Sequence, residues 1–138
     1  MNVVLDTNVV VSSFIAPASA PAKVLELVSE DQFEILVSEA ILEEYASVLK
    51  YPRIQARHRR SDVEVADIIA GLRTLATIVE PTRRLAVVKE DAEDNKFVEC
   101  AVEGGAEFIV SGDKHLLALR EYEGIQILSP AAFLTVFQ

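Results

Sequence analysis

The chain has little cysteine, no long apolar run and fewer basic than acidic residues. Its single cysteine, Cys100, excludes an internal disulfide framework and a zinc site built from several cysteines. No apolar run approaches the roughly 20 residues of a membrane-spanning helix. The first six residues, which end at Asp6, lack the basic start of a secretory signal peptide. We therefore expect a soluble, cytoplasmic protein with no membrane association.

Positive charge is scarce overall, with 13 Lys and Arg against 22 Asp and Glu and a formal net charge of −9. Because phosphate groups are bound chiefly by Lys and Arg, this balance by itself argues against a nucleic-acid partner. The charges are unevenly distributed, however: residues 50–60 contain five basic side chains and no acid, whereas residues 88–115 contain three basic and eight acidic side chains. The two segments are either solvated faces or a polyanion-binding rim beside a carboxylate site.

The length of 138 residues fits a single domain over 1–138, and a hydrophobic content of 51% is typical of a folded chain. Short apolar runs alternate with segments of helical periodicity. The pattern predicts strands over 2–5, 33–37, 77–79, 107–110 and 125–128, and helices over 20–30, 38–49, 61–76, 94–102, 113–119 and from 129 onward. Short, non-alternating strands between helices indicate a three-layer α/β/α fold with a central parallel sheet of four to five strands.

In such sheets ligands bind beyond the carboxyl ends of the strands, so polar residues that directly follow a strand are candidate site residues. Asp6 follows the first predicted strand and Asp113 follows a later one. Either carboxylate alone is explained equally well as a helix N-cap. Their recurrence at two strand ends favours a shared site. Thr7, Asn8 and Ser111 would position water or phosphate there, or would only make local turn hydrogen bonds.

Two further acids lie on or beside the apolar faces of predicted helices. At about 100° per residue, Asp94 points in the mean direction of the apolar side chains that follow it, so we expect it to be buried as an N-cap, a paired group or a metal ligand. Asp91 lies one turn earlier and is a less secure member of the set. Glu44 lies at the shoulder of the apolar stripe of its helix and can turn inward, whereas Glu43 points to solvent.

Several carboxylates in one cleft cannot all remain ionised unaided, because like charges raise each other's pKa values. A divalent cation resolves this conflict, and Mg²⁺ and Mn²⁺ prefer oxygen ligands and retain bound water. Such a cation activates water as a nucleophile and neutralises charge that develops on a phosphate. We therefore expect Mg²⁺ or Mn²⁺ at these acids.

Four motifs resemble those of the PIN domain in order and spacing: Asp6-Thr7-Asn8, Ser38 through Glu44-Tyr45, Asp94-Asn95-Lys96-Phe97 and Ser111-Gly112-Asp113. The resemblance spans almost the whole chain and is greatest to the VapC-like toxin components of toxin–antitoxin systems. It implies a Mg²⁺- or Mn²⁺-dependent ribonuclease with a small antitoxin partner. By this resemblance the catalytic and metal-binding acids are Asp6, Glu44, Asp94 and Asp113, and the substrate-positioning residues are Thr7, Asn8 and Ser111.

The chain departs from the family pattern at two positions. Ser111 replaces the usual threonine but keeps the hydroxyl, and His115 stands where many relatives have a further acid. The missing acid weakens the case for a second metal ion more than the case for the first.

Residues 50–60 supply candidate RNA contacts, with solubility or contact with a protein partner as equally good explanations. We assign these contacts to Arg53, Arg57, Arg59 and Arg60, with Arg83 and Arg84 as a second group. Single-stranded or looped RNA is favoured over duplex, because its backbone can enter a cleft. A homodimer is the expected assembly, and the apolar residues of the last helix belong either to the core or to its interface.

Two alternative functions can be weighed from the sequence. A non-catalytic PIN-like module that binds RNA or another protein is the more serious one, although a degenerate site should have lost acids. A HAD-like phosphotransferase is disfavoured because it needs a second aspartate two positions after the first, where this chain has Asn8.

Overall fold

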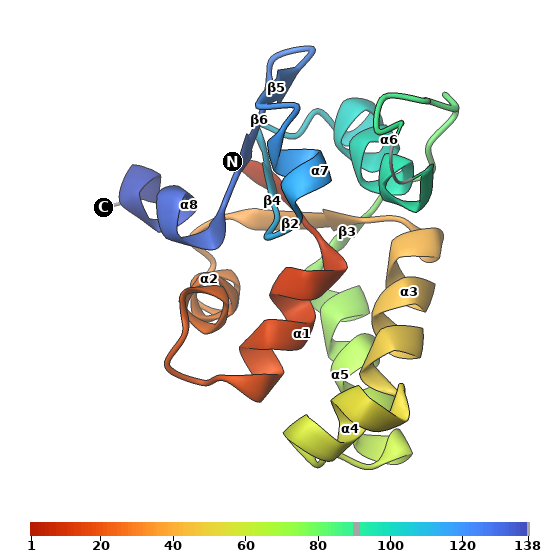
Figure 1. Cartoon of the computed structure of the whole chain (residues 1–138), viewed down its shortest axis with the longest axis vertical. Helices are drawn as coiled ribbons and strands as arrows, with labels where there is room; N and C mark the ends of the chain where they lie inside the picture. Colours follow the sequence, from red (N-terminus) through yellow and green to blue (C-terminus); the bar gives the residue numbers. More distant parts are fainter. Residues whose placement is uncertain (90–91, 138) are drawn as a thin grey trace.

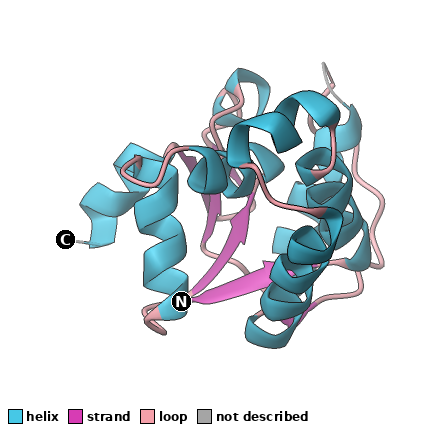
Figure 2. Ribbon diagram, turned by 90° about the horizontal axis from the view of Figure 1, so that it is seen from below, coloured by secondary structure: helices cyan, strands magenta, loops and turns pink. Residues whose placement is uncertain are grey.

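In the computed structural model, which describes residues 1–89 and 92–137, helices cover both faces of a six-stranded sheet (Figures 1 and 2). The strands are β1 (Asn2–Leu5), β2 (Glu34–Val37), β3 (Thr77–Ile78), β4 (Phe108–Val110), β5 (Glu121–Tyr122) and β6 (Ile125–Leu128). The helices are α1 (Thr7–Ile15), α2 (Ala20–Ser29), α3 (Glu39–Leu49), α4 (Pro52–His58), α5 (Asp62–Leu75), α6 (Asn95–Gly104), α7 (Lys114–Leu117) and α8 (Pro130–Phe137), and a 3-10 turn (Ala92–Asp94) precedes α6. The predicted α/β/α architecture is confirmed.

The strand order is β3-β2-β1-β4-β6-β5, and every neighbouring pair is parallel except β5 and β6. The order reverses between β1 and β4, because β2 and β3 lie on one side of β1 while β4 and β6 lie on the other. Leu5 pairs with Val110, so the chain leaves both central strands at the same edge of the sheet. The sheet has one strand more than predicted, since the two-residue β5 is too short to give a periodic signal.

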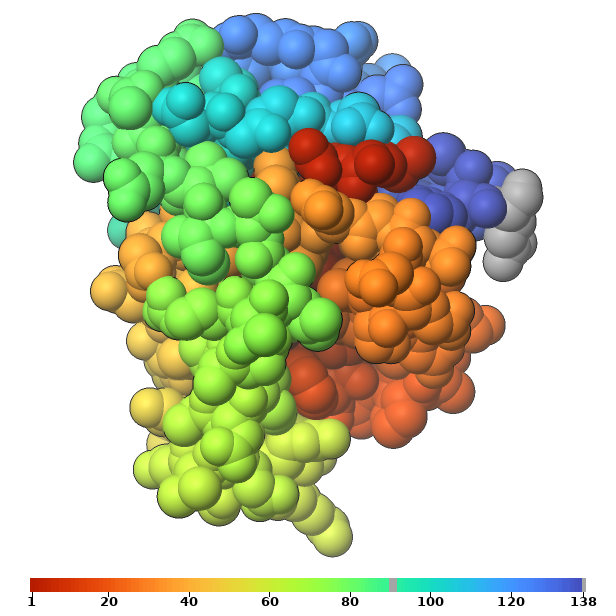
Figure 3. Space-filling view, turned by 180° about the vertical axis from the view of Figure 1, so that it is seen from behind, coloured from red at the N-terminus to blue at the C-terminus, as the bar shows by residue number. Residues whose placement is uncertain are grey.

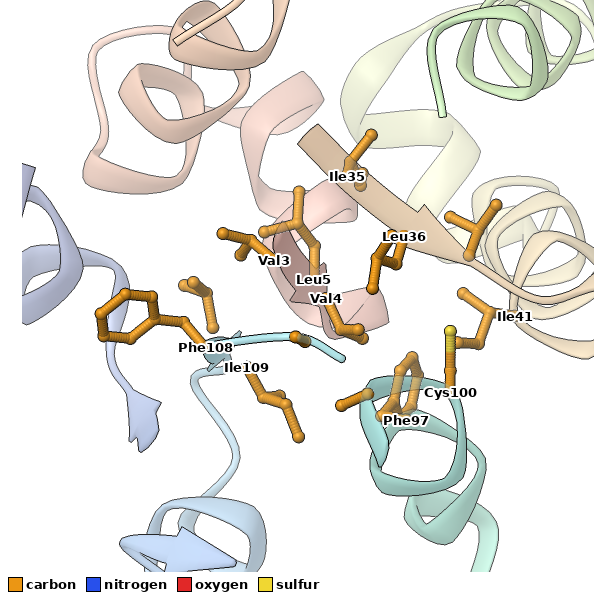
Figure 4. Packing of buried hydrophobic residues seen from close by; sticks show 14 of the residues in the cluster. Val3, Val4, Leu5, Ile35, Leu36, Ile41, Phe97, Cys100, Phe108 and Ile109 are labelled. Atoms are coloured by element: carbon orange, nitrogen blue, oxygen red, sulfur yellow. The ribbon is translucent and has the colours of Figure 1, made fainter. Parts of the chain in front are cut away.

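The main core cluster includes both faces of the central strands, with α1, α2, α3 and α8 contributing buried side chains as well as α6. Figure 4 shows Phe97 and Cys100 of α6 facing the side chains of Val4 and Leu36 on β1 and β2. All four are buried. Burial raises the pKa of the Cys100 thiol to about 12, so this residue is an inert packing group, as expected of a lone buried cysteine.

Capping side chains begin the predicted helices where the sequence places them. Ser38 accepts a hydrogen bond from the Ile41 N–H at 3.2 Å and starts α3. Ser61 and Glu64 form the reciprocal capping box of α5. Ser129 accepts the N–H of the third residue of α8 in the same way.

Two helices lie where none is predicted from the sequence. α1 contains three consecutive valines of low helix propensity, which are buried in the fold, and burial overrides that propensity. α4 lies within the basic segment 50–60 and has a proline in its first turn. Among the described residues no single helix is long and apolar enough to cross a membrane, although α1 and α2, bent by 99° at their junction, pass that test of length and composition as a pair.

Candidate metal centre

Asp6 lies at the carboxyl end of β1 and is only 3% exposed. Its backbone N–H still belongs to the sheet, where it donates to the Val110 carbonyl at 2.9 Å. One carboxylate oxygen accepts the Thr7 N–H at 2.7 Å and thereby caps α1. The other accepts hydrogen bonds from Asn8 Nδ2 at 3.0 Å and from Ser111 Oγ at 2.6 Å. The N-cap and site interpretations of Asp6 are therefore compatible.

Residues 111–113 follow β4, the neighbour of β1. Ser111 is fully buried, and its hydroxyl donates to Asp6 while it accepts the Asp113 N–H at 2.9 Å. Asp113 also caps α7 by accepting the N–H of His115 at 3.1 Å. A single serine hydroxyl thus links the Asp6 carboxylate to the backbone of Asp113.

Asp94 ends the 3-10 turn before α6 and is buried, as its helical phase predicts. The adjacent Asn95 accepts the N–H groups of residues 87 and 88 at 3.0 and 2.8 Å, which fixes the preceding loop against the start of α6. Carboxylate oxygens of Asp94 and Asp113 lie within 4.8 Å of each other, and a hydrogen bond between the two side chains lowers the pKa of Asp113. Asp91, the less secure candidate, lies outside the described residues.

Ligand-capable oxygens of Asp6, Asp94 and Asp113 lie within 4.8 Å of one another. Burial raises the pKa of Asp6 to about 6, against the lowering effect of the hydrogen bonds from Ser111 and the Thr7 N–H, and the negative charge of Asp113 adds to the rise. An all-oxygen set at this spacing, with two of its three carboxylates buried, is the donor chemistry that hard divalent cations prefer. The residues present therefore fit a divalent metal ion.

Glu44 lies beside this cluster on α3, and its neighbour Glu43 is exposed, as predicted. One Glu44 oxygen accepts a hydrogen bond from the Thr7 hydroxyl, and the other pairs with the Lys96 ammonium at 2.5 Å. Burial opposes the charge of Lys96, but the hydrogen bond and charge of Glu44, with Glu93 at 3.4 Å, outweigh it and raise the pKa of Lys96. Glu44 is thus held between the Thr7 hydroxyl and the Lys96 ammonium, which is charged at neutral pH.

Sequence reasoning assigned no role to Lys96 or to Asn95. Both residues stand directly after Asp94, and α6 places Lys96 against Glu44 and Asn95 against the loop before it. A lysine two residues after a buried acid is a weak signal, because most such lysines are solvated.

The acids open into a pocket of about 460 Å³, which α1, α3 and α4 line together with the strand-end acids. Among the described residues that line this acidic pocket, Arg57 is the one basic side chain. Six of the seven predicted site residues line this pocket: Asp6, Thr7, Asn8, Glu44, Asp94 and Asp113. The seventh, Ser111, is fully buried and is not part of the lining.

The other predicted RNA-binding arginines lie elsewhere. Arg60 packs over the Phe14 ring, with its guanidinium carbon 4.9 Å from the ring centroid, and donates to the Phe14 carbonyl at 3.3 Å. Arg53 and Arg59 are exposed, in the first turn and at the C-cap of α4. The turn between α4 and α5 forms the lower end of the molecule in the view from behind (Figure 3). In the second group, Arg83 pairs with Glu123 at 3.2 Å and Arg84 with Glu99 at 3.7 Å. The structure therefore brings only Arg57 of these six arginines to the acidic pocket.

Comparison with known proteins gives a family match, a relative at 31% identity and solved structures that share the fold. The family model described as PIN domain matches residues 2–115. An uncharacterised protein of Methanocaldococcus jannaschii, MJ1680, is 31% identical over 121 residues, which cover 88% of this chain and 76% of that protein.

Two solved structures share the fold. PAE2754 from Pyrobaculum aerophilum superposes with a TM-score of 0.60 at 18% identity, covering 99% of this chain and 90% of that one. VapBC2 from Rickettsia felis, in a structure bound to a promoter DNA fragment, superposes with a TM-score of 0.59 at 16% identity. The superposition covers 92% of this chain and 97% of that one. At these identities the likeness concerns the fold alone.

Proposed function

Because the chain belongs to the PIN domain family, whose members are generally metal-dependent nucleases, we propose that it is an endoribonuclease that uses Mg²⁺ or Mn²⁺. The observation that carries this proposal is the convergence of three carboxylates from β1, the turn before α6 and the end of β4, with oxygens within 4.8 Å of one another. Such a cluster is electrostatically unfavourable without a cation, and this supports metal binding as its function.

The residues divide into holding and orienting groups. Asp6, Asp94 and Asp113 would hold the ion, which when bound supplies an activated water and neutralises charge on the phosphate. Ser111 and Asn8 fix the Asp6 carboxylate through the two hydrogen bonds at 2.6 and 3.0 Å. Glu44, held by Thr7 and Lys96, would complete the ligand shell or orient the attacking water. Preorganised groups of this kind need no rearrangement during the reaction.

The proposed substrate is single-stranded or looped RNA, whose backbone reaches the acids past Arg57. The proposed biological role is that of a toxin in a toxin–antitoxin pair, with a small antitoxin as partner, in the cytoplasm and as a homodimer. The fold shared with VapBC2 supports this role, and an antitoxin-like reading frame next to the gene would support it further. A non-catalytic RNA-binding or protein-interaction module is the alternative, and the complete acidic cluster argues against it.

Cleavage of a mixed-structure RNA tests the proposal. Purified protein should cleave with Mn²⁺ or Mg²⁺ and not with EDTA. Asp6→Asn should lower the rate roughly 100-fold or more, the scale expected when a preorganised charge is lost from the transition state. Asp67→Asn, on the exposed face of α5, is the matched control and should cleave like the unmodified protein.

A second matched pair lies on one helix, because Glu44→Gln should impair cleavage and Glu43→Gln should not. Circular dichroism establishes that each variant is folded. Undiminished cleavage by folded Asp6→Asn would rule out the proposed site. RNA binding without cleavage under any divalent metal would favour the non-catalytic alternative.

A further inference from the structure

A second pocket, which we call the neutral pocket, lies next to the acidic pocket on the other side of α1. It has a volume of about 430 Å³, within the roughly 300–1,000 Å³ usual for small-molecule sites. Its walls come from α1, the starts of α2 and α8, and the turn after β4. Among the described residues that line it, none has an ionisable side chain: Asn8, Val9, Ser12, Ala20, Pro21, Gly112, Ser129, Pro130 and Ala131.

The neutral and acidic pockets are contiguous. Asn8 and Ser12, one turn apart on α1, line both of them. At the strand-end turn, Gly112 lines the neutral pocket and the next residue, Asp113, lines the acidic one. The Asn8 amide forms a fixed wall between them, because it donates to Asp6 at 3.0 Å and accepts the Gly112 N–H at 3.0 Å.

The two pockets differ in the ligand chemistry that they can accept. The acidic pocket offers carboxylates for a cation and Arg57 for a phosphate. The neutral pocket has no side-chain charge to attract a phosphate. Its proline and valine surfaces suit a flat, uncharged group, and the hydroxyls of Ser12 and Ser129 suit the polar edge of such a group.

A nucleotide joins these two chemistries, because its charged phosphate and its neutral base are linked through one sugar. We propose that the neutral pocket binds the base of the nucleotide next to the cleaved phosphodiester, and that it sets the base preference of the enzyme. This inference rests on the proposed nuclease function for its biological meaning. Base binding itself can be measured without any cleavage.

The first experiment measures binding of the four nucleoside 5′-monophosphates by amide chemical shifts in the presence of Mg²⁺. We expect shifts at the lining residues of α2 and α8, centred on Ala20 and Ala131. Ala131→Leu fills the pocket from an exposed helical position and should weaken binding about tenfold, the scale of one lost base contact. Ala132→Leu, the next exposed residue of α8 and not part of the lining, should bind like the unmodified protein.

The second experiment maps cut sites in a random-sequence RNA. The unmodified protein and Ala132→Leu should show the same base preference beside the cut, whereas Ala131→Leu should cleave about tenfold more slowly with a flattened preference. Ala20→Leu fills the pocket from α2 and gives the same test should Ala131→Leu be unfolded.

The outcomes separate the two proposals. Absence of nucleotide-induced shifts at the neutral pocket, or equal binding by both α8 variants, overturns the base-binding proposal even if RNA is cleaved. Shifts at the pocket that are lost in Ala131→Leu support it even if no RNA is cleaved, in which case only the nuclease function fails.

Discussion

Asp6 combines a structural and a chemical role because its two carboxylate oxygens have different partners. One oxygen caps α1 through the Thr7 N–H, and the other is aligned by Ser111 and Asn8 beside the remaining acids. Burial at this position makes the ionised form unfavourable and brings the pKa of Asp6 to about 6. A cation bound beside Asp6 would stabilise the ionised carboxylate and so offset the cost of burying its charge.

We expect the metal-free protein to become more stable as the pH falls from about 7 to about 5. The pKa of folded Asp6 is about 6 against an ordinary value of 3.8, so in this window the folded protein binds a proton that the unfolded chain does not. The charged form destabilises the fold by about 3 kcal/mol at neutral pH; protonation removes roughly 1 kcal/mol of this between pH 7 and pH 5 and most of the rest by pH 3.8. The pKa of Asp113 is lowered, so protonation of Asp113 reduces stability as the pH falls, but only below about its ordinary pKa of 3.8.

Urea unfolding in EDTA across this pH range measures the effect. The pH dependence should disappear in Asp6→Asn and persist in Asp67→Asn. An identical slope in Asp6→Asn would show that another group titrates in this window.

At the scale of elements, α4 places the arginines of the basic segment 50–60 in different surroundings, although the sequence does not distinguish them. His58, at the end of α4, accepts the Arg60 N–H on Nδ1 at 3.0 Å, so its Nε2 carries the proton and donates to the Leu49 carbonyl at 2.8 Å. This bridge fixes α4 to the end of α3. As a result Arg57 lines the acidic pocket while Arg60 packs on Phe14 of α1.

Arg57→Ala should weaken RNA binding about tenfold, as expected for loss of a charge-assisted contact. It should also reduce the slope of log affinity against log salt by about 1, because one phosphate contact is lost. Fluorescence anisotropy with Ca²⁺ in place of Mg²⁺ measures both quantities. Lys23→Ala, exposed on α2 and outside the lining of the acidic pocket, is the control and should leave the slope unchanged. Equal slopes for the two variants would remove Arg57 from the RNA path.

At the scale of the whole molecule, the net charge of −9 no longer argues against RNA. Three of the acids behind it are gathered at one edge of the sheet, where a divalent cation would offset them. The topology makes this possible, since β1 and β4 are adjacent and parallel and end together at the point where the strand order reverses. The acidic balance instead predicts weak metal-free affinity for RNA and a strict requirement for metal.

Saturating Mn²⁺ should stabilise the folded protein, because the clustered geometry exists only in the folded state. At 100 times its dissociation constant the ion contributes about 2.7 kcal/mol, which raises the Tm by on the order of 10 °C. Differential scanning calorimetry with and without EDTA measures the shift. Asp113→Asn should lose most of it, and Asp67→Asn should retain it. A Tm that does not respond to Mn²⁺ or Mg²⁺ would contradict metal binding by the free protein.

Much of the fold could be predicted because its determinants are local. Apolar runs, the Ser38 cap and the Ser61 capping box are properties of a few consecutive residues, and the predicted elements follow them closely. α1 was not predicted because its valines have low helix propensity, which their burial in the core overrides. β5 was missed because a two-residue strand is defined by its partner β6 and not by a pattern of its own.

The sequence by itself determined which acids are available: Asp6 and Asp113 after strands, Asp94 on a buried helical face, and Glu44 in preference to Glu43. Only the tertiary structure decided that three of them converge, that Lys96 holds Glu44, that Arg57 alone of six arginines reaches the acidic pocket, and that a neutral pocket adjoins it. The physical reason is that helical and strand periods fix the direction of a side chain within its own element. Strand order and helix packing, which join residues about 100 positions apart, fix the distances between elements.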